Sequence, residues 1–256
     1  MLVLSYHEIT AAQTPYRYSV SEARFASQVR LAARHEGVRF TFDDGHISQF
    51  QYALPTLEAH GAKGTFFVTA GWTGTPRMMD WPELIELTRL GHEVQAHGWH
   101  HKFLTDCSPA ELDQELRQPR ETLQDRLGVP VDALSLPHGR WNARVLSRCQ
   151  ELGYKRVYGS YPWFGKRERL RYPGLELIGR CNIVRDTSDE AFARMLQQGV
   201  DRQWLPRIRG TISATLRNTL GDHTYHRLWC LFARRDAADL PAEHETATEP
   251  KGGTPL

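Results

Sequence analysis

Short apolar segments alternate with capped helical segments through most of this chain, and that alternation is the strongest constraint on its fold. Residues 38–42 and 64–69 are short and rich in β-branched or aromatic side chains, as buried strands are. Between such segments lie amphipathic stretches that begin at a capping residue and stop at glycine, for example from Asp80 to Gly91. This repetition predicts βα units around a mainly parallel sheet, and it favours an α/β barrel over an open doubly wound sheet.

The expected elements follow one another with short connections. Strands are predicted at residues 1–7, 38–42, 64–69, 92–96, 133–136, 154–158 and 175–183. Helices are predicted at residues 19–36, 48–60, 80–90, 108–127, 141–152 and 187–196. Loops after the carboxyl ends of parallel strands are where sites are built in both candidate folds.

Three regions are expected from the 256 residues. Residues 1–199 form one α/β barrel domain, because a chain of this length can bury a single sizeable core. Residues 200–235 carry apolar side chains at helical spacing beside several arginines and are predicted to form a basic helical extension that packs on the domain. Peripheral contact of that helix with an anionic membrane is the alternative. Residues 236–256 are expected to be disordered, since little in them can form a core.

Charge and cysteine content narrow the function classes. A formal net charge of +2 gives no excess of positive charge for nucleic acid, which is therefore not an expected partner. The scattered cysteines form no CxxC pair, so neither a zinc-thiolate site nor a disulfide framework is predicted. The first apolar run is too short for a signal-peptide core, and nothing approaches the roughly 20 apolar residues of a membrane span. A cytoplasmic protein is the resulting expectation.

Two adjacent carboxylates, Asp43 and Asp44, stand where the predicted strand 38–42 turns into a loop. Neighbouring side chains on a strand point to opposite faces, but a glycine at the turn lets both acids face one pocket. One carboxylate can then bind a metal while the other accepts a proton from water. An Asp-Gly turn with a helix cap is the structural alternative.

A histidine pair follows the predicted strand 92–96. His97 and His101 are four residues apart, so on a helical turn both rings would face the same way and could bind one metal. His100 would point away and is expected outside the metal site. With Asp44 as the third ligand, one position stays open for water. Zinc suits two imidazoles and a carboxylate best, while cobalt, nickel and iron also fit.

These motifs, in this order, resemble those of the polysaccharide deacetylase family, also called the NodB-homology domain or carbohydrate esterase family 4. The resemblance rests on the Thr-Phe-Asp-Asp-Gly stretch at 41–45, the His-x-x-x-His at 97–101 and the Pro-His-Gly at 137–139, and it extends over about residues 1–195. It implies a distorted (β/α) barrel and metal-dependent hydrolysis of an acetyl group on a sugar. It also implies an acetylated sugar or oligosaccharide as the partner.

By position, the resemblance assigns a role to each residue. Asp43 is implied as the general base, and Asp44, His97 and His101 as the metal ligands. The backbone N–H of His138 is implied to stabilise the oxyanion. Pro137, in the same loop, is expected on the substrate side.

Two departures from the family pattern concern the proton transfers. Ser135 stands where the family usually has an arginine that orients the base, so another residue must hold Asp43. The late Leu-x-His motif that supplies the general acid is absent, because the comparable segment contains Arg180 and no histidine. His138, His223 and His226 are alternative proton donors.

Two further side chains are candidates for substrate contact. Arg180 cannot release a proton at neutral pH, so it is expected to bind substrate charge. Trp163 is expected either to form an apolar wall for the acetyl group or sugar face or to be an ordinary core aromatic.

The sequence therefore predicts a metal-dependent hydrolase that removes an acetyl group from an N-acetylated sugar or polysaccharide precursor. A hydrolase of a non-sugar amide bond on the same fold is the first alternative. A catalytically silent carbohydrate-binding member is the second, motivated by the two departures and opposed by the complete metal triad.

Overall fold

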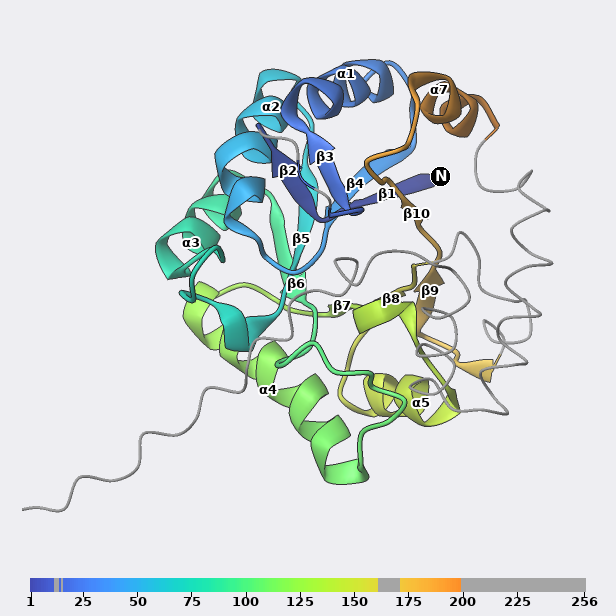
Figure 1. Ribbon diagram of the computed structural model, residues 1–256. Helices are drawn as coiled ribbons and strands as arrows, with labels where there is room; N and C mark the ends of the chain where they lie inside the picture. The colour runs from blue at the N-terminus through green and yellow to red at the C-terminus, as the bar shows by residue number, and fades with distance from the viewer. Residues whose placement is uncertain (12–13, 15, 161–170, 199–256) are drawn as a thin grey trace, which may run out of the picture.

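The computed structural model describes residues 1–11, 14, 16–160 and 171–198 (Figure 1). The strands are β1 Leu2–Tyr6, β2 Glu8–Thr10, β3 Ser19–Ser21, β4 Val38–Phe42, β5 Gly64–Val68, β6 Glu93–Ala96, β7 Ala133–Ser135, β8 Arg156–Tyr158, β9 Glu176–Ile178 and β10 Cys181–Asn182. The α-helices are α1 Glu22–Ala32, α2 Leu54–Ala59, α3 Trp81–Arg89, α4 Pro109–Leu127, α5 Ala143–Glu151 and α7 Asp189–Gln198. A π-helix spans Gln49–Ala53, and 3₁₀ turns span Ala70–Trp72 and Pro137–Gly139.

Eight parallel strands form one curled sheet whose order is β10-β1-β4-β5-β6-β7-β8-β9. Helices lie around the outside of this sheet (Figure 1). From β1 to β9 the order follows the chain without the reversal that defines a doubly wound sheet. The predicted barrel is confirmed, in a form whose two edge strands are β9 and β10. The chain passes directly from one edge strand to the other through Gly179 and Arg180.

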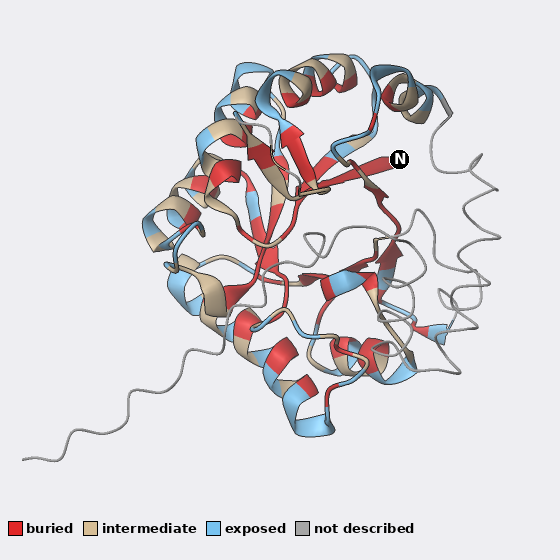
Figure 2. Cartoon of the chain, viewed as in Figure 1, coloured by how far each residue is buried: buried red, intermediate tan, exposed pale blue. Residues whose placement is uncertain are grey.

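The core has two parts because successive strand side chains point to opposite faces. A large cluster lies between the sheet and the helices, and red residues mark it on the strands and inner helix faces in Figure 2. A small second cluster is formed by alternate strand residues from the other face of the sheet: Val3, Phe67, Ala133, Tyr158 and Ile178. That second face lines the inside of the barrel.

Phe42 on β4 is a central contact of the larger cluster, and we expect its loss to lower stability. The side chain is fully buried, and its ring centroid lies 4.7 Å from that of Phe66, 5.7 Å from Tyr6 and 5.8 Å from Phe25. Aromatic pairs add about 0.5–1.5 kcal/mol each beyond area burial. Phe42→Leu should therefore lower the free energy of unfolding by about 1–3 kcal/mol, measured by chemical denaturation. An unchanged midpoint would contradict this account of the core.

Some predicted elements differ from the observed ones. The strand expected at 175–183 is two short strands, because the chain turns at Gly179 and Arg180. β2 falls in the loop expected after the first strand, and β3 occupies residues 19–21, which were expected to begin a helix; the two strands pair in parallel. The helix expected at 48–60 begins as a π-helix, and Pro55 falls in the first turn of α2, which follows the π-helix directly.

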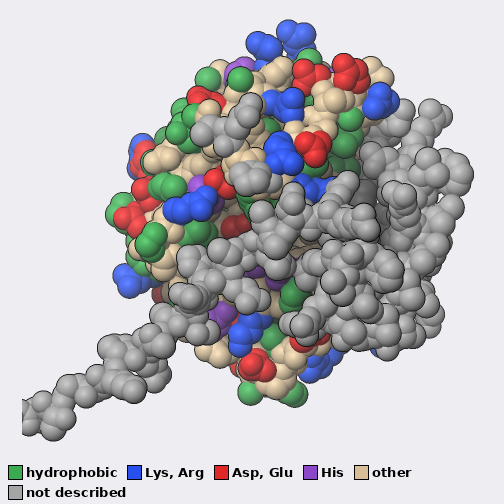
Figure 3. Space-filling view, viewed as in Figure 1, with side chains coloured by type: hydrophobic (Ala, Val, Ile, Leu, Met, Phe, Trp, Pro, Cys, Tyr) green, Lys and Arg blue, Asp and Glu red, His purple; other side chains and the backbone are tan. Residues whose placement is uncertain are grey.

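Two predicted regions, the basic helix at 200–235 and the tail at 236–256, lie outside the described residues, as does the membrane contact considered for that helix. Within the described ranges, the helices are all too short or too polar to cross a membrane. On the face shown in Figure 3, histidine side chains reach the surface near the middle. Lysine and arginine side chains are spread among acidic ones around them.

Candidate metal and active site

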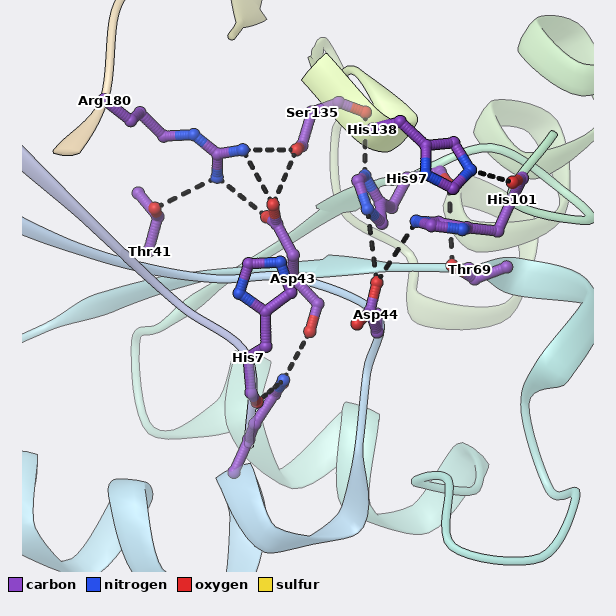
Figure 4. Close-up of polar contacts among 11 residues, drawn as sticks. His7, Thr41, Asp43, Asp44, Thr69, His97, His101, Ser135, His138 and Arg180 are labelled. Atoms are coloured by element: carbon purple, nitrogen blue, oxygen red, sulfur yellow. Dashed lines mark hydrogen bonds and ion pairs between the residues drawn. The ribbon is translucent and has the colours of Figure 1, made fainter. Parts of the chain in front are cut away.

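The candidate site lies at the carboxyl edge of the sheet, where the parallel strands end together. Loops after β1, β4, β6, β7 and β9 each send a side chain to this edge (Figure 4). The residues brought together are His7, Asp43, Asp44, His97, His101, Ser135, His138 and Arg180.

Asp44, His97 and His101 form the cluster of potential metal ligands that the sequence predicted. Asp44 Oδ1 lies 3.3 Å from His97 Nε2 and 3.4 Å from His101 Nε2. One ligand atom from each residue lies within 4.8 Å of the other two. Asp44 Oδ1 is buried and has no hydrogen-bond donor among the described residues. A carboxylate oxygen left without a donor between two imidazole nitrogens fits a divalent cation.

The orientation of His97 also suits a metal ligand. Its Nδ1 lies 2.8 Å from the carbonyl oxygen of Ser135 and donates to it, since a carbonyl can only accept. In the neutral ring this leaves the lone pair of Nε2 facing Asp44. Burial lowers the pKa of His101 to about 4, so that ring is neutral at pH 7. Both histidines can therefore offer a lone pair.

Left-handed backbone turns, rather than a helical turn, bring these ligands together. Asp44 has φ 76° and Gly45 has φ 85°. The turn therefore begins at Asp44, and it overrides the strand alternation that would point Asp43 and Asp44 to opposite faces of the sheet. Gly98 has φ 77° and His101 has φ 60°. The expected helical geometry of the His-x-x-x-His motif is therefore wrong. Non-glycine residues in this conformation are strained and concentrate at functional sites.

Asp43 is held inside the barrel by Arg180. The carboxylate is only 2% exposed, and its two oxygens each accept a hydrogen bond of 2.7 Å from the guanidinium of Arg180. Ser135 Oγ donates a further bond of 3.1 Å to Asp43 Oδ2. Burial alone would raise the pKa of Asp43, but the positive charge of Arg180 and its hydrogen bonds outweigh it and hold the pKa at about 2. Asp43 is therefore an ionised carboxylate in a fixed orientation.

The position of Arg180 contradicts the substrate-binding role expected from the sequence. Its side chain is fully buried. Its Nε donates to the carbonyl of Gly159, one terminal nitrogen donates to Thr41 and Asp43, and the other donates to Asp43 and Ser135. A guanidinium has five N–H donors, and these contacts use all five. Arg180 therefore has no donor left for a substrate.

Arg180 is also the residue that holds Asp43 in place of an arginine at position 135. Arg180, the second residue after β9, takes the orienting role that the resemblance assigned to an arginine at position 135, and Ser135 Oγ accepts a 2.7 Å hydrogen bond from it. A signal for this was present in the sequence. Ile178 faces the barrel interior, and Arg180 follows it by two residues, the period of a strand.

His7 is a site residue that the sequence analysis missed. It extends the interior-facing series Val3 and Ser5 on β1 by two residues, which was the available signal. Its ring lies beside Asp43 in Figure 4, with the ring of Tyr18 4.7 Å away on centroids. Its buried Nδ1 has no hydrogen-bond partner among the described residues. Burial lowers the pKa of His7, while the negative charges of Asp44 and Asp43 oppose that shift.

The remaining predicted site residues occupy different surroundings. The ring of His138 stacks on Phe103 at 3.9 Å, and its Nε2 lies 3.1 Å from the carbonyl oxygen of His101. Pro137 is buried in the 3₁₀ turn after β7, and its expected contact with substrate stays a prediction. Trp163 lies outside the described residues, as do His223 and His226.

Comparison with known protein families and curated sequences gives one consistent result. A family model described as polysaccharide deacetylase matches residues 32–157. The peptidoglycan-N-acetylglucosamine deacetylase PgdA of Listeria monocytogenes is 30% identical over 187 residues, which cover 72% of this chain and 37% of that protein. The peptidoglycan-N-acetylmuramic acid deacetylase PdaA of Bacillus subtilis is 30% identical over 130 residues, which cover 50% of this chain and 48% of that protein. The chain thus spans half or less of the length of these relatives.

Solved structures share the fold. The Streptococcus pyogenes deacetylase PplD, solved with acetate, superposes with a TM-score of 0.68 at 23% identity, covering 77% of this chain and 97% of that chain. IcaB from Ammonifex degensii gives a TM-score of 0.62 at 20% identity, covering 77% of this chain and 95% of that chain. At these identities the structures establish the barrel architecture and not the activity.

Proposed function

Because the chain belongs to the polysaccharide deacetylase family, we propose that it is a metal-dependent hydrolase that removes acetyl groups from N-acetylated sugar polymers or their precursors. The observation that carries this proposal is Asp44 Oδ1 between two imidazole nitrogens, directly beside the ionised Asp43. The names of PgdA and PdaA, two deacetylases of peptidoglycan amino sugars, support an N-acetylated amino sugar as the substrate class.

Asp44, His97 and His101 would hold the cation, and the two imidazoles and one carboxylate suit zinc, with cobalt, nickel and iron as alternatives. When bound, such a cation polarises an acetyl carbonyl and makes water a better nucleophile. Asp43 accepts the proton of the attacking water, with Arg180 and Ser135 fixing the direction of its carboxylate. The N–H of His138 would stabilise the oxyanion.

We assign the second proton transfer, to the leaving nitrogen, to the protonated form of His7, whose ring becomes neutral in that step. Its Nδ1, which has no hydrogen-bond partner among the described residues, and its place beside Asp43 favour it over His138, whose ring is stacked on Phe103 and turned to the His101 carbonyl. A positioned acid contributes about 10²–10⁴-fold. His7→Ala should therefore lower kcat by about 10²-fold or more on an acetylated amine, and His138→Ala by much less.

An aryl acetate tests this assignment, because its phenolate leaves without a proton from the protein. His7→Ala should keep near wild-type kcat on the aryl acetate while failing on the N-acetyl sugar. Equal losses on both substrates would show that His7 supports the site rather than donating the proton.

The proposed activity is tested by following acetate release after chelation and reloading with zinc, cobalt or nickel. Acetate should be released from N-acetylglucosamine oligomers or peptidoglycan by loaded protein, and not from an acylated non-sugar amine. His101→Ala should lower the rate of acetate release by more than the roughly 10–100-fold that removing the hydrogen-bond partner of a metal ligand costs. Activity confined to the non-sugar amide would support the alternative hydrolase instead.

The hydrogen bonds of Arg180 remove one of the two reasons for considering a catalytically silent carbohydrate-binding protein. That alternative was based partly on the missing arginine before the Pro137 loop, and Arg180 fills that role. If loaded protein bound acetylated oligosaccharides but released no acetate, this alternative would replace the proposal.

A further inference from the structure

Glu115 on α4 is a buried carboxylate that takes no part in the proposed proton transfers. Its side chain is 1% exposed. Its Oε2 accepts hydrogen bonds of 2.9 Å from the backbone N–H groups of Trp99 and His100, and its Oε1 lies 2.6 Å from His100 Nδ1. A carboxylate at this depth needs such partners, and here all of them belong to the loop between the two histidine ligands.

Backbone hydrogen bonds hold that loop from its other side. The N–H of Ala70 donates to the carbonyl of Gly98 at 3.1 Å, and the N–H of Gly71 donates to the carbonyl of Trp99 at 3.0 Å. The fit is close, because a Cβ on Gly71 would lie 2.4 Å from that carbonyl oxygen. The loop is therefore clamped between the 3₁₀ turn after β5 and the side chain of Glu115.

The two histidine ligands depend on this loop to different degrees. His97 has direct anchors, since its N–H donates to Val68 at 2.9 Å and its Nδ1 donates to Ser135 at 2.8 Å. His101 lies beyond the loop with φ 60°, a conformation that its surroundings must impose. The hydrogen bonds that Glu115 accepts fix Trp99 and His100, the two residues immediately before it.

We propose that Glu115 is a positioning residue of the metal site: its carboxylate holds the 98–100 loop so that His101 Nε2 stays beside Asp44 and His97. The inference rests on the proposed metal site. In this proposal α4, which contributes no metal ligand, sets the spacing of the ligands through Glu115. Residues that orient metal ligands in this way typically affect metal affinity by 10–100-fold.

The test compares metal affinity in two Glu115 variants, by competition with a chromogenic chelator for zinc and cobalt. Glu115→Leu removes the acceptor and should weaken binding by about 10–100-fold. Glu115→Gln keeps an oxygen that can accept from both N–H groups, while its amide can donate to His100 Nδ1, so it should bind within a few-fold of wild type. Loss of affinity in both variants, or in neither, would overturn the role assigned to the hydrogen bonds.

A matched control separates positioning from general stability. Leu116 is the next residue on α4 and is fully buried, and its apolar side chain makes no hydrogen bond, so Leu116→Ala destabilises the same helix but keeps the hydrogen bonds that Glu115 accepts from the loop. It should melt at lower temperature yet bind metal like wild type. If its affinity falls as much as that of Glu115→Leu, the effect is general loosening and the proposal fails.

Hydrogen exchange in metal-free protein makes the result independent of the proposed function. The amides of Trp99 and His100 should exchange faster in Glu115→Leu than in wild type or in Leu116→Ala. Unchanged exchange at these amides overturns the proposal. Absence of metal binding in wild-type protein would instead remove the proposed function, and the exchange result would still show whether Glu115 orders the loop.

Discussion

Asp43→Asn is expected to lower kcat by about 10²–10⁴-fold, which is the usual contribution of a positioned general base. Asparagine keeps the size of the side chain but cannot accept the proton of the attacking water at neutral pH. Metal affinity should stay near that of wild type, because Asp44, His97 and His101 are unchanged. The measurements are kcat for acetate release and cation affinity in the same preparation.

The substitution also leaves the charge of Arg180 buried without its partner. Breaking a buried pair costs about 3–5 kcal/mol, so Asp43→Asn should also be less stable. A second variant that combines Asp43→Asn with Arg180→Met removes the unpaired charge and should recover much of that stability. Its kcat should stay low. Recovery of activity together with stability would show that Asp43 is structural and not the base.

The cluster of Asp44, His97 and His101 could be predicted from sequence because each of these residues follows a strand with a clear local signature. Residues 38–42 and 92–96 are both recognisable as strands, and their carboxyl ends meet at the same edge once the sheet is parallel. Only that much geometry is needed to bring Asp44 close to His97 and His101. The same reasoning placed Asp43 beside them.

The partners of Asp43 could not be predicted in this way. Arg180 lies 137 positions from Asp43 in the chain. The two side chains meet only because the curled sheet brings the turn between β9 and β10 close to the end of β4. The predicted strand 175–183 would place Arg180 on the same face as Ile178, but the sequence does not say which face of that strand lines the interior of the barrel. His7 was missed for a related reason: it lies just past β1, where the alternation of the strand was not followed into the loop.

Exchanging the residues at positions 180 and 135 tests whether Arg180 orients Asp43. Arg180→Ser should lower kcat by about 10²-fold or more, since a small misplacement of a reacting group costs that much. KM should change little, because all five donors of Arg180 are already used within the protein. Adding Ser135→Arg should restore a large part of kcat, because its guanidinium can enter the vacated space beside Asp43. A raised KM with unchanged kcat would instead return Arg180 to substrate binding.

The pH profile separates this orienting effect from a loss of folding. In wild type the pKa of Asp43 is about 2, so the base form persists into the acid range. Without Arg180, burial is less opposed and the pKa rises, so the acid limb of kcat/KM should move to higher pH. The double variant that combines Arg180→Ser with Ser135→Arg replaces the positive charge and should move the limb back. A partly unfolded variant would lose activity at every pH alike, whereas a misplaced and protonated base loses it first on the acid side.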